Sequence, residues 1–408
     1  MAENKQNKRP NVPPLRFSEF SEPWERYKVS DILDFYSTNS LSWEQLEFTD
    51  GELRNLHYGM IHVGLPTLLN LRESKLPTIK DGNEPKSYTL CINGDVAFAD
   101  ASEDTNDVAK AIELVETDGQ KVVFGLHTIH GRDNKGLTEA GFKGYLFSSR
   151  VFHDQIKRIA QGTKVFSISN KNFSECFVGI PSKAEQSKIA RLFSLLDRRI
   201  AVQSKLIEDL KQLKSALVER LYSQHNPNCR IGDLVVQVSK RNHNNNDYSV
   251  LSVNNRLGFI EQSEQFEDRS VASDDTSNYK VVSRDDFAYN PARISVGSIA
   301  RLTSFENGIV SPMYICFHTK KQLLPQYLEH FFDTRYFHYE MQKRLEGSVR
   351  LCLSWEGLCN IPLEVPSVEQ QEKVSKRILR LVDKISLEER HLNLLKSQKQ
   401  YLLQAMFI

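Results

Sequence analysis

The sequence predicts an α+β protein with a pseudo-two-fold internal repeat. Two mixed α/β domains are expected, separated by two long helices that form an antiparallel coiled coil. Three observations predict this fold class. The chain has 408 residues, which exceeds the usual size of one hydrophobic core and favours two or more domains. Part of the first half recurs in the second half at a fixed offset, and each copy ends in a long segment without proline or glycine.

The repeat has an offset of 185 residues. Residues 146–222 align with residues 331–407 without a gap, and 16 of the 77 aligned positions are identical. Average composition would give about four or five identities by chance. Conservative pairs fill many of the other aligned positions, which indicates two copies of one structural frame.

Shorter matches continue upstream of the aligned part. Residues 94–98 (GDVAF) resemble 285–289 (DDFAY), and 28–32 (KVSDI) resemble 230–234 (RIGDL). The stretches between these matches, at about 33–93 and 235–284, do not align. Simple drift after duplication would spread differences evenly along the chain. The uneven pattern therefore favours two fronts with different specific roles on a shared frame.

Each copy of the repeat ends in a predicted long helix. Ser182 and Ser367 are good N-cap residues, each followed three positions later by Glu or Gln. Apolar residues then recur every three or four positions in the same register in both copies, which predicts one apolar stripe on each helix. The residues expected to pack along these stripes are Ile189, Leu196, Ile200, Leu210, Leu217, Val374, Leu381, Ile385, Leu395 and Leu402.

The length of these helices favours their pairing with each other. About 35–40 residues at 1.5 Å each give a rod of roughly 50–60 Å, which is too long to lie wholly on a small domain. An antiparallel pair is the simplest packing, and the alternative is that each helix belongs to the core of its own domain. Both are basic, with net charges of +4 over 183–222 and +3 over 368–408, which fits either phosphate contact or solvated faces.

The rest of the chain is expected to form two mixed α/β domains. Short β-type runs between Gly, Asn and Asp turns predict strands at 88–92, 95–98, 121–124, 248–253, 279–282 and 308–317. A helix precedes the repeated glycine in each copy, over 145–161 and 324–346. The predicted segments are a tail at 1–20, a first domain at 21–180, a central helix at 181–225, a second domain at 226–366 and a C-terminal helix at 367–408.

Polar loops in both domains carry residue types that contact nucleic acid. Residues 240–247 form a basic, Asn-rich loop, and Asn and Arg make bidentate contacts to adenine and guanine edges, although such a loop is also a common solvated turn. Residues 289–298 combine asparagine, arginine, serine and glycine. Residues 162–164 and 347–350 each place a cation beside small residues whose N–H groups can approach phosphate. Within a duplicated frame, these loops favour a reader of two nucleic-acid sites.

Composition excludes several classes of protein. Lys and Arg total 53 against 52 Asp and Glu, a net charge of +1, so a uniformly basic coat is excluded while a local basic face is not. No apolar run reaches the 18 residues of a membrane span, and the polar N-terminus lacks the apolar part of a secretory signal. Six scattered cysteines without a CxxC motif indicate reduced thiols and disfavour zinc.

Catalytic motifs are missing as well. The sequence has no P-loop, no GxSxG motif and no glycine loop for S-adenosylmethionine, and residues 290–293 (NPAR) lack the aromatic of an adenine methyltransferase motif. His127 and His130 form an HxxH without a third ligand, for which a buried or hydrogen-bonded pair is expected and no metal. The carboxylates of Glu103, Asp104 and Asp107 lack the lysine of a nuclease site. We therefore expect a non-catalytic chain.

Several strings resemble the specificity (S) subunit of type I restriction-modification systems. They are 11–17 (NVPPLRF), 94–98 with 101–105 (ASEDT), 125–129 (GLHTI), 289–293 (YNPAR) with 296–298 (VGS), and the helix entries 180–186 and 365–371. Their order, together with the half-chain repeat, extends the resemblance over nearly the whole chain.

The resemblance implies two target recognition domains, each reading one half of a bipartite, asymmetric DNA target. The helices would act as a ruler for the unread spacer, and a rod of roughly 50 Å suits half-sites about 34 Å apart. The implied partners are double-stranded DNA, two methyltransferase (M) subunits and restriction/translocase (R) subunits. S-adenosylmethionine, ATP and Mg²⁺ would be bound by those subunits and not by this chain, in a bacterial or archaeal cytoplasm.

We expect the DNA contacts to come from both domains. The candidate residues are Ser102, His127, Arg132, Lys164, Lys240, Arg241, Asn244, Asn290, Arg293, Ser295, Arg301 and Arg350. A scaffold that tethers protein partners without DNA affinity, and a stand-alone nuclease, are the alternatives. The two helices differ at one acidic residue, because Asp383 lies one position, or about 100°, away from the equivalent of Asp197, which leaves open whether their docking surfaces are equivalent.

Overall fold

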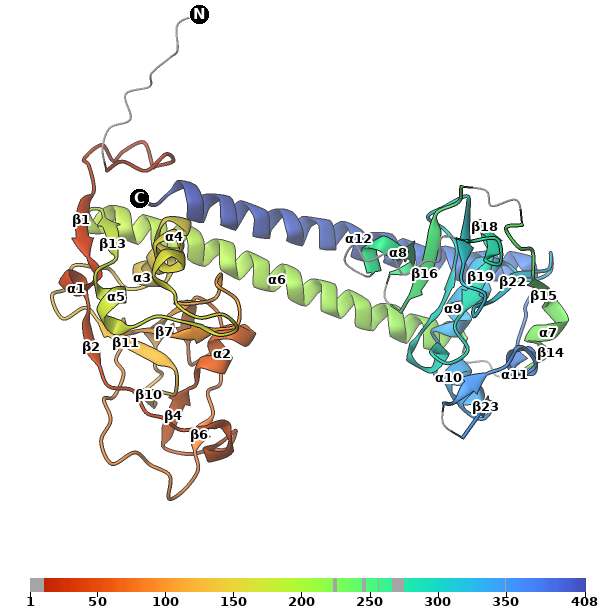
Figure 1. Cartoon of the computed structure of the whole chain (residues 1–408), viewed down its shortest axis with the longest axis horizontal. Helices are drawn as coiled ribbons and strands as arrows, with labels where there is room; N and C mark the ends of the chain where they lie inside the picture. Colours follow the sequence, from red (N-terminus) through yellow and green to blue (C-terminus); the bar gives the residue numbers. More distant parts are fainter. Residues whose placement is uncertain (1–10, 223–225, 244–246, 256, 266–274, 349) are drawn as a thin grey trace, which may run out of the picture. The chain divides into compact units, whose positions relative to one another are not determined.

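The computed structural model describes residues 11–222, 226–243, 247–255, 257–265, 275–348 and 350–408. The chain forms two compact units, which we call unit 1 (Met1–Ser204 and Arg390–Ile408) and unit 2 (Lys205–Glu389). Each unit contains one α/β domain and a segment of each long helix, α6 (Lys183–Leu221) and α12 (Val368–Ala405) (Figure 1). The predicted fold class is confirmed.

A central antiparallel-rich sheet organises unit 1. Its strand order is β2 (Asp34–Tyr36), β11 (Thr128–Arg132), β7 (Val96–Ala99), β9 (Ala111–Glu116) and β5 (Leu68–Asn70). Side chains alternate between the two faces of a strand. Accordingly, Val96 and Phe98 join a core shared with the helices, whereas Ala97 and Ala99 join a second core. The sheet therefore lies between two hydrophobic layers.

Three smaller sheets and several short helices complete unit 1. The sheets are β10 (Lys121–Phe124), β4 (Leu53–Leu56), β6 (Thr78–Ile79) and β3 (Leu46–Glu47); β1 (Glu25–Lys28) with β13 (Phe177–Ile180); and β12 (Phe166–Ser167) with β8 (Ala101–Ser102). The helices are α1 (Val29–Ile32), the 3₁₀ turn η1 (Trp43–Gln45), α2 (Tyr58–Val63), α3 (Phe142–Phe147), α4 (Arg150–Ile159) and α5 (Asn170–Ser174).

Unit 2 is built in the same way. Its central sheet runs β15 (Val235–Val238), β22 (Ile315–Thr319), β19 (Phe287–Tyr289) and β20 (Ile299–Arg301). The other sheets are β17 (Gly258–Glu261), β16 (Val250–Asn254), β21 (Asn307–Val310) and β18 (Lys280–Ser283); β14 (Cys229–Arg230) with β25 (Pro362–Leu363); and β23 (Leu345–Glu346) with β24 (Cys352–Leu353). The helices are α7 (Ile231–Leu234), α8 (Gln262–Gln265), η2 (Ile294–Val296), α9 (Pro325–Phe332), α10 (Arg335–Gln342) and α11 (Trp355–Cys359).

The two domains share a topology that reaches into the segments whose sequences do not align. The order β2-β11-β7-β9 in unit 1 corresponds to β15-β22-β19-β20 in unit 2, with antiparallel pairing throughout. Each second sheet also contains one parallel pair, β4 with β10 and β16 with β21. The variable fronts are therefore two elaborations of one fold.

A buried glutamine fixes the start of each long helix in the same way. Gln186 and Gln371 are 1% and 0% exposed. Each side chain accepts one backbone N–H bond and donates to two carbonyls, and the partners are 185 residues apart in sequence. They are Glu139 N, Leu137 O and Pro181 O for the first, and Leu324 N, Gln322 O and Pro366 O for the second. Both copies of the repeat thus share this set of three hydrogen bonds as well as an apolar pattern.

The segments of α6 and α12 run antiparallel within each unit. In unit 1, Asp197 pairs with Lys399 at 2.5 Å, and in unit 2, Lys211 pairs with Glu389 at 2.6 Å. Among the ten residues predicted to pack along the stripes, Ile189, Leu196, Ile385 and Leu395 are buried, and the other six are half-buried. The same helices also enter the domain cores, since Ile189 and Ile378 belong to them, so the core-helix alternative holds for their first turns.

Some predicted elements differ from the structure. The strand expected at 88–92 is wrong, because Tyr88, Leu90 and Ile92 are 43%, 41% and 52% exposed and this stretch makes no ladder. The helix expected at 145–161 is two helices, α3 and α4, because the Ser149 side chain accepts a hydrogen bond from Phe152 N and starts a new helix. Thr334 divides α9 from α10 in the same way.

His330 in unit 2 occupies the repeat position of Tyr145 in unit 1. The Tyr145 hydroxyl donates to Asp197 at 3.0 Å, but the repeat position of Asp197 is Val382. His330 Nε2 is therefore buried without a hydrogen-bond partner among the described residues. Burial lowers the pKa of His330 to about 4.

Acidification is expected to destabilise unit 2 through His330. Because its pKa is lower in the folded chain than the ordinary value of 6.5, the folded state favours the neutral ring. Above pH 6.5 the ring is neutral in both states, and the free energy of unfolding is not lowered by His330. Between pH 6.5 and pH 4 this free energy falls by about 1.4 kcal/mol per pH unit, or about 3 kcal/mol in total. Thermal unfolding measures the melting temperatures of the wild type and of His330→Phe between pH 7 and pH 4. The melting temperature of the wild type should fall more steeply with decreasing pH than that of the variant. An equal fall in both proteins would contradict this.

No helix in the described part of the chain is both long and apolar enough to cross a membrane.

Candidate nucleic-acid interface

A tight glycine turn lies beside the end of a buried central strand in each unit. Gly162 and Gly347 have φ angles of +138° and +121°. A Cβ atom would lie 1.9 Å from Val165 O in the first turn and 2.3 Å from Arg350 O in the second, so only glycine fits. Hydrogen bonds from Ile168 N to Asp100 O and from Leu353 N to Pro291 O then bring the loop after β7 or β19 next to the turn. In each unit, the glycine turn and the loop after the central strand thus meet to form what we call a corner. The two corners lie at equivalent places in the repeat.

The corner of unit 2 is a cleft of about 470 Å³. It is lined by the predicted residues Asn290, Arg293 and Arg350, together with Asn254 and Asn255 at the end of β16. Arg293 and Arg350 are exposed, and within the described residues their guanidinium groups have no ion pair or hydrogen bond. Two free cations beside three amide side chains suit both phosphate contact and bidentate base contact.

The loop that carries Arg293 is anchored to the sheet. Asn290 Oδ1 accepts a hydrogen bond from Ala292 N at 3.1 Å, and Ser298 Oγ donates to Val253 O at 3.3 Å. Asn255 Nδ2 also donates to Val296 O at 3.3 Å. These bonds hold the 3₁₀ turn η2 against β16 and leave Arg293 on the outside. The loop is therefore a fixed platform for its arginine.

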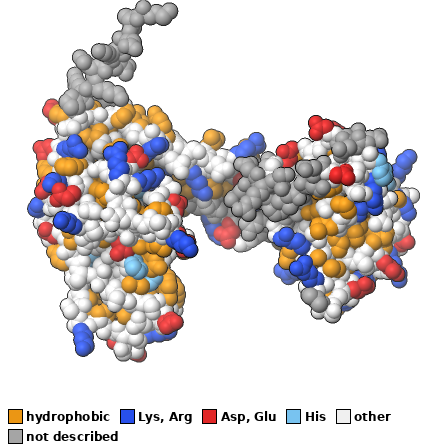
Figure 2. Space-filling model, viewed as in Figure 1, with side chains coloured by type: hydrophobic (Ala, Val, Ile, Leu, Met, Phe, Trp, Pro, Cys, Tyr) orange, Lys and Arg blue, Asp and Glu red, His pale blue; other side chains and the backbone are white. Residues whose placement is uncertain are grey.

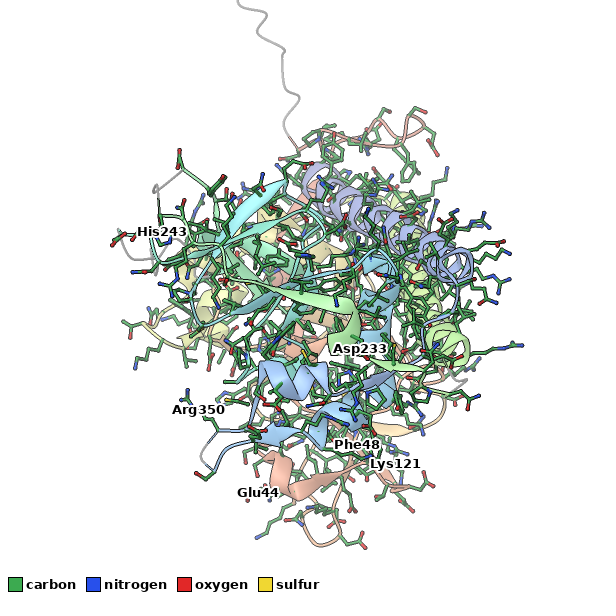
Figure 3. All side chains as sticks on the ribbon, turned by 90° about the vertical axis from the view of Figure 1, so that its right-hand side faces the viewer. Glu44, Phe48, Lys121, Asp233, His243 and Arg350 are labelled. Carbon is green, nitrogen blue, oxygen red and sulfur yellow. The ribbon has the colours of Figure 1, made fainter. Side chains whose placement is uncertain are left out.

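On the face of unit 2 that Figure 2 shows, an apolar area is bordered by basic and acidic side chains. The predicted Lys240 and Arg241 are exposed, and Arg241 donates to Asn278 at 2.9 Å, next to Tyr279 in the lining of the cleft. His243 from the same loop and Arg350 project from the same side of unit 2 (Figure 3). Ser295 is exposed beside Arg293, and Asn244 lies outside the described residues.

The corner of unit 1 has a different chemistry. His127 has a φ of +55° and its exposed ring contacts Asp100 at 3.2 Å. Burial raises the pKa of Asp100, and His127 opposes the shift. Tyr58 packs edge-on against His127 with ring centres 5.2 Å apart, and His62 Nε2 lies 3.0 Å from Ala101 O. This corner presents imidazole, phenol and carboxyl groups where unit 2 presents amides and arginines.

Two other predicted residues of unit 1 lie at this corner. Ser102 is half-buried in β8, which pairs with β12 directly after the glycine turn, and its hydroxyl accepts a bond from Asp104 N. Lys164 is exposed in the turn itself, and its ammonium group has no partner among the residues described. Sequence reasoning thus selected residues at both corners.

Two predicted DNA contacts, Arg132 and Arg301, are engaged in ion pairs within the protein. Arg132 forms a bidentate pair with the buried Asp95, at 2.8 and 2.7 Å, and also donates to Leu90 O. The side chain of Arg301 is 8% exposed and bridges Asp285 and Glu329 at 2.7 and 2.8 Å. These contacts join neighbouring elements of the fold, so neither guanidinium group is available for DNA.

One group in the described chain has metal-ligand geometry. The ligand atoms of Cys91, Asp95 and His130 lie within 4.8 Å of one another and are buried. Asp95 is, however, already neutralised by Arg132, and His130 Nε2 bonds to it at 2.8 Å. Burial also raises the pKa of the Cys91 thiol well above its usual value, which keeps it protonated. The arrangement suits a structural ion pair better than a metal.

Sequence reasoning missed part of both corners. Tyr58, His62 and the half-exposed Trp43 extend the first corner, and Asn254 and Asn255 extend the second. The run 57–62 (HYGMIH) contains two histidines and a tyrosine, which is a usable signal. Residues 254 and 255 are recognisable only once β16 is placed beside the loop after β19.

Comparison with known proteins identifies the fold. No protein-family model and no curated protein matches the sequence. A type I restriction-modification system S subunit from M. genitalium matches 97% of this chain and 99% of its own length, at 15% identity and a TM-score of 0.56. A chain from a structure of type I R-M complex assembly and conformational transition matches 93% and 96%, at 12% identity and a TM-score of 0.59. The chain therefore has the fold of these S subunits.

Proposed function

We propose that this chain is the non-catalytic DNA-specificity subunit of a type I restriction-modification complex. In this proposal, each α/β domain reads one half of a bipartite target. The observation that carries it is the pair of equivalent corners with unlike side chains, around Asp100 and His127 in unit 1 and around Arg293 and Arg350 in unit 2. Two identical half-sites would call for two similar surfaces. Unlike surfaces on one frame favour an asymmetric target.

The side chains suggest what each corner reads. Arginine pairs with guanine O6 and N7, and asparagine pairs with adenine N6 and N7 in the major groove. Unit 2, with Arg293, Arg350 and Asn290, therefore suits a half-site containing guanine and adenine. A carboxylate accepts a hydrogen bond from cytosine N4, so Asp100 in unit 1 suits a different base. Lys164 and Lys240 would contact phosphate and set the orientation.

The long helices are proposed to set the spacer and to dock two methyltransferase subunits. Beyond the stripes that pack α6 on α12, each helix carries large apolar side chains in the open. They are Leu195, Val202, Leu394 and Tyr401 in unit 1, and Leu206, Leu213 and Leu387 in unit 2. Within a unit, neighbouring residues of this set on one helix are seven positions apart, a spacing that suits the apolar face of a partner helix.

The chemistry of the complex would belong to the partners. Methylation of adenine with S-adenosylmethionine is assigned to the methyltransferase subunits, and ATP- and Mg²⁺-dependent cleavage to restriction/translocase subunits. This chain would supply the DNA sequence specificity.

Salt dependence separates this proposal from a protein scaffold. The chain, co-purified with its methyltransferase subunits, is expected to bind its target duplex with an affinity whose logarithm falls linearly with the logarithm of salt concentration, with a slope of about −0.9 per neutralised phosphate. Fluorescence anisotropy from 50 to 200 mM KCl measures the slope. Absence of duplex affinity, with partner binding that salt does not change, would support the scaffold instead. Metal-dependent cleavage by the purified chain alone would indicate a nuclease.

A further inference from the structure

The first described residues of the chain form an irregular loop over the start of α6 in unit 1, and its two ends meet where Trp24 N donates to Asn11 O at 2.8 Å. We call residues 11–24 the arm. Leu15 N donates to Ala405 O at 2.9 Å, and Trp24 is 2% exposed with its ring 6.2 Å from that of Phe407. A Cβ atom on Gly179 would lie 3.0 Å from the Trp24 ring. The arm therefore fills a groove between the first turns of α6, the end of α12 and β13.

Charged side chains clamp the arm in place. Arg16 forms a bidentate ion pair with Glu185, with both bonds at 2.7 Å. The ammonium group of Lys188 pairs with Glu19 and lies over the rings of Phe17 and Phe20, 5.8 and 5.6 Å from their centres. Glu185 is 0% exposed beneath the arm. One cation of the groove, Lys188, thus pairs with an acidic residue of the arm, and one carboxylate, Glu185, pairs with a basic residue of the arm.

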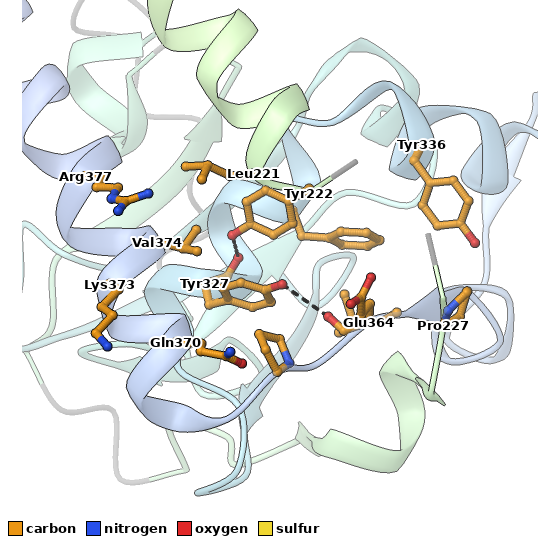
Figure 4. A pocket seen from close by; sticks show the side chains of 13 residues that line it. Leu221, Tyr222, Pro227, Tyr327, Tyr336, Glu364, Gln370, Lys373, Val374 and Arg377 are labelled. Carbon is orange, nitrogen blue, oxygen red and sulfur yellow. Dashed lines mark hydrogen bonds between the residues drawn. The ribbon is translucent and has the colours of Figure 1, made fainter. Parts of the chain in front are cut away.

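The equivalent groove in unit 2 is open. It has a volume of about 290 Å³ and is lined by Tyr222, Tyr327, Phe331, Lys373, Val374 and Arg377, among others (Figure 4). Tyr222 is the repeat position of Phe407, and Lys373 is that of Lys188. Residues 226–228 lead into β14 and place Pro227 in the lining of the groove, and none of the described residues covers this groove as the arm covers its counterpart.

The covered groove of unit 1 and the open groove of unit 2 differ in the exposure of their residues and in their free volume. Glu185, Ile189 and Pro181 are buried in unit 1, whereas at the repeat positions Gln370 is exposed and Val374 and Pro366 are half-buried. The free space left in unit 1, beside Val151, Val178 and Gly179, is about 140 Å³. The corresponding residues Tyr336, Leu363 and Glu364 line the larger groove of unit 2.

The floor of the open groove is already organised. The Tyr222 hydroxyl donates to Tyr327 O at 2.6 Å, and the Tyr327 hydroxyl donates to Glu364 O at 3.2 Å (Figure 4). The rings of these tyrosines pack against each other with centres 4.8 Å apart and their planes tilted by 33°. Fixed aromatic walls leave little to reorganise when an apolar side chain enters, which favours binding.

The charges of the open groove differ from those of the covered one. Gln370 replaces Glu185, so no carboxylate awaits a basic residue at the place of Arg16. Lys373 is retained, and Arg377, one turn further along α12, stands at the position of Leu192. Within the described residues Arg377 makes no ion pair, and the exposed Lys373 pairs only with the exposed Glu369 of its own helix. Glu364 is the one carboxylate among the described residues of the lining, and it accepts a bond from Asn226 N at 3.4 Å. With two cations against one carboxylate, the lining has a net positive charge and favours an acidic segment.

We propose that this groove in unit 2 is a docking site for a short loop segment of a partner protein. That segment carries aromatic or leucine side chains for the tyrosine-lined floor and a carboxylate for Lys373 and Arg377, and it has no basic residue at the place of Arg16. It takes in unit 2 the position that the arm takes in unit 1. This inference does not depend on the DNA-specificity role, because the probe below contains no DNA.

A peptide based on the arm tests the proposal. The probe is a fluorescein-labelled peptide of residues 11–24 in which the position of Arg16 is glutamine, to face Gln370. The full chain is expected to bind it saturably in fluorescence anisotropy. Lys373→Glu should weaken binding at least tenfold, and a second peptide with Glu19→Lys should recover binding to that variant. Lys376→Glu, on the same helix, exposed and outside the lining, is the matched control and should change affinity less than twofold.

Other occupants give distinct results. Equal binding by the wild type and Lys373→Glu, or no saturable binding at millimolar peptide, would overturn the proposal. Concentration-dependent self-association of the wild type that the probe competes away would identify the arm of a second copy as the occupant and would also overturn it. So would a loss of duplex DNA binding in Lys373→Glu with unchanged peptide binding, since the groove would then contact phosphate.

Discussion

Replacing Arg293 with alanine is expected to weaken binding at one half of the DNA target about 10- to 100-fold while sparing the other half. The guanidinium group is exposed at the edge of the cleft and free of partners among the described residues, so it is available for a bidentate base contact. Such a contact is worth about 1–3 kcal/mol of discrimination, and each 1.4 kcal/mol is a factor of ten. Competition binding with duplexes that carry single-base changes in either half-site measures the effect.

The control for Arg293→Ala is Arg284→Ala. Arg284 is also exposed in unit 2, pairs with Glu306 and lies outside the lining of the cleft. The Arg293 variant should lose discrimination at one or two positions of one half-site, and the Arg284 variant should keep the wild-type preference at both. An equal loss at both half-sites would reject the assignment of Arg293 to base reading, because unit 1 has its own, different corner.

Replacing Asp95 with alanine is expected to destabilise the chain by about 3–5 kcal/mol. The Asp95 side chain is fully buried and accepts bonds from Arg132, His130 and Ile92 N. Burial alone would raise the pKa of Asp95, but the bonds from Arg132 and His130 hold this pKa below its usual value. Removing one partner of a buried pair leaves the other charge without compensation. Thermal or urea unfolding of unit 1 measures the loss.

Asp118→Ala is the matched control for Asp95→Ala. Asp118 also pairs with an arginine, Arg72, but both side chains are about half exposed or more, and such surface pairs contribute about 0–1 kcal/mol. A small effect of Asp95→Ala, similar to that of Asp118→Ala, would show that Arg132 does not depend on this pair. Arg132 would then regain its place among the DNA contacts.

The helices were predictable from sequence because their signals are local. An apolar residue every three or four positions and a serine with Glu or Gln three residues later are enough to place α6 and α12 to within a few residues. The breaks at Ser149 and Thr334 were missed because the flanking apolar pattern continues across them. The capping serine or threonine in each is the signal that reveals the break.

The shared sheet topology could not be predicted, because its strands are short and their pairing is non-local. β8, β12 and β3 have two residues each, too few for an alternating pattern. The candidate site was predicted in part for a related reason. Asn290, Arg293 and Arg350 came from loop composition, whereas the ion pairs of Arg132 and Arg301 depend on Asp95 and Glu329, which only the fold brings near.

The proposed role as a DNA-specificity subunit is best tested by a genome-wide map of N6-methyladenine in the source cell with the gene intact, deleted and restored. Deletion is expected to abolish methylation at one split, asymmetric motif, and restoration should return it at the same motif. The motif would supply both half-sites and the spacer for the Arg293 experiment. An unchanged map in cells whose methyltransferase subunits are expressed, or loss of a continuous palindromic motif, would contradict the reading of two unlike half-sites by this chain.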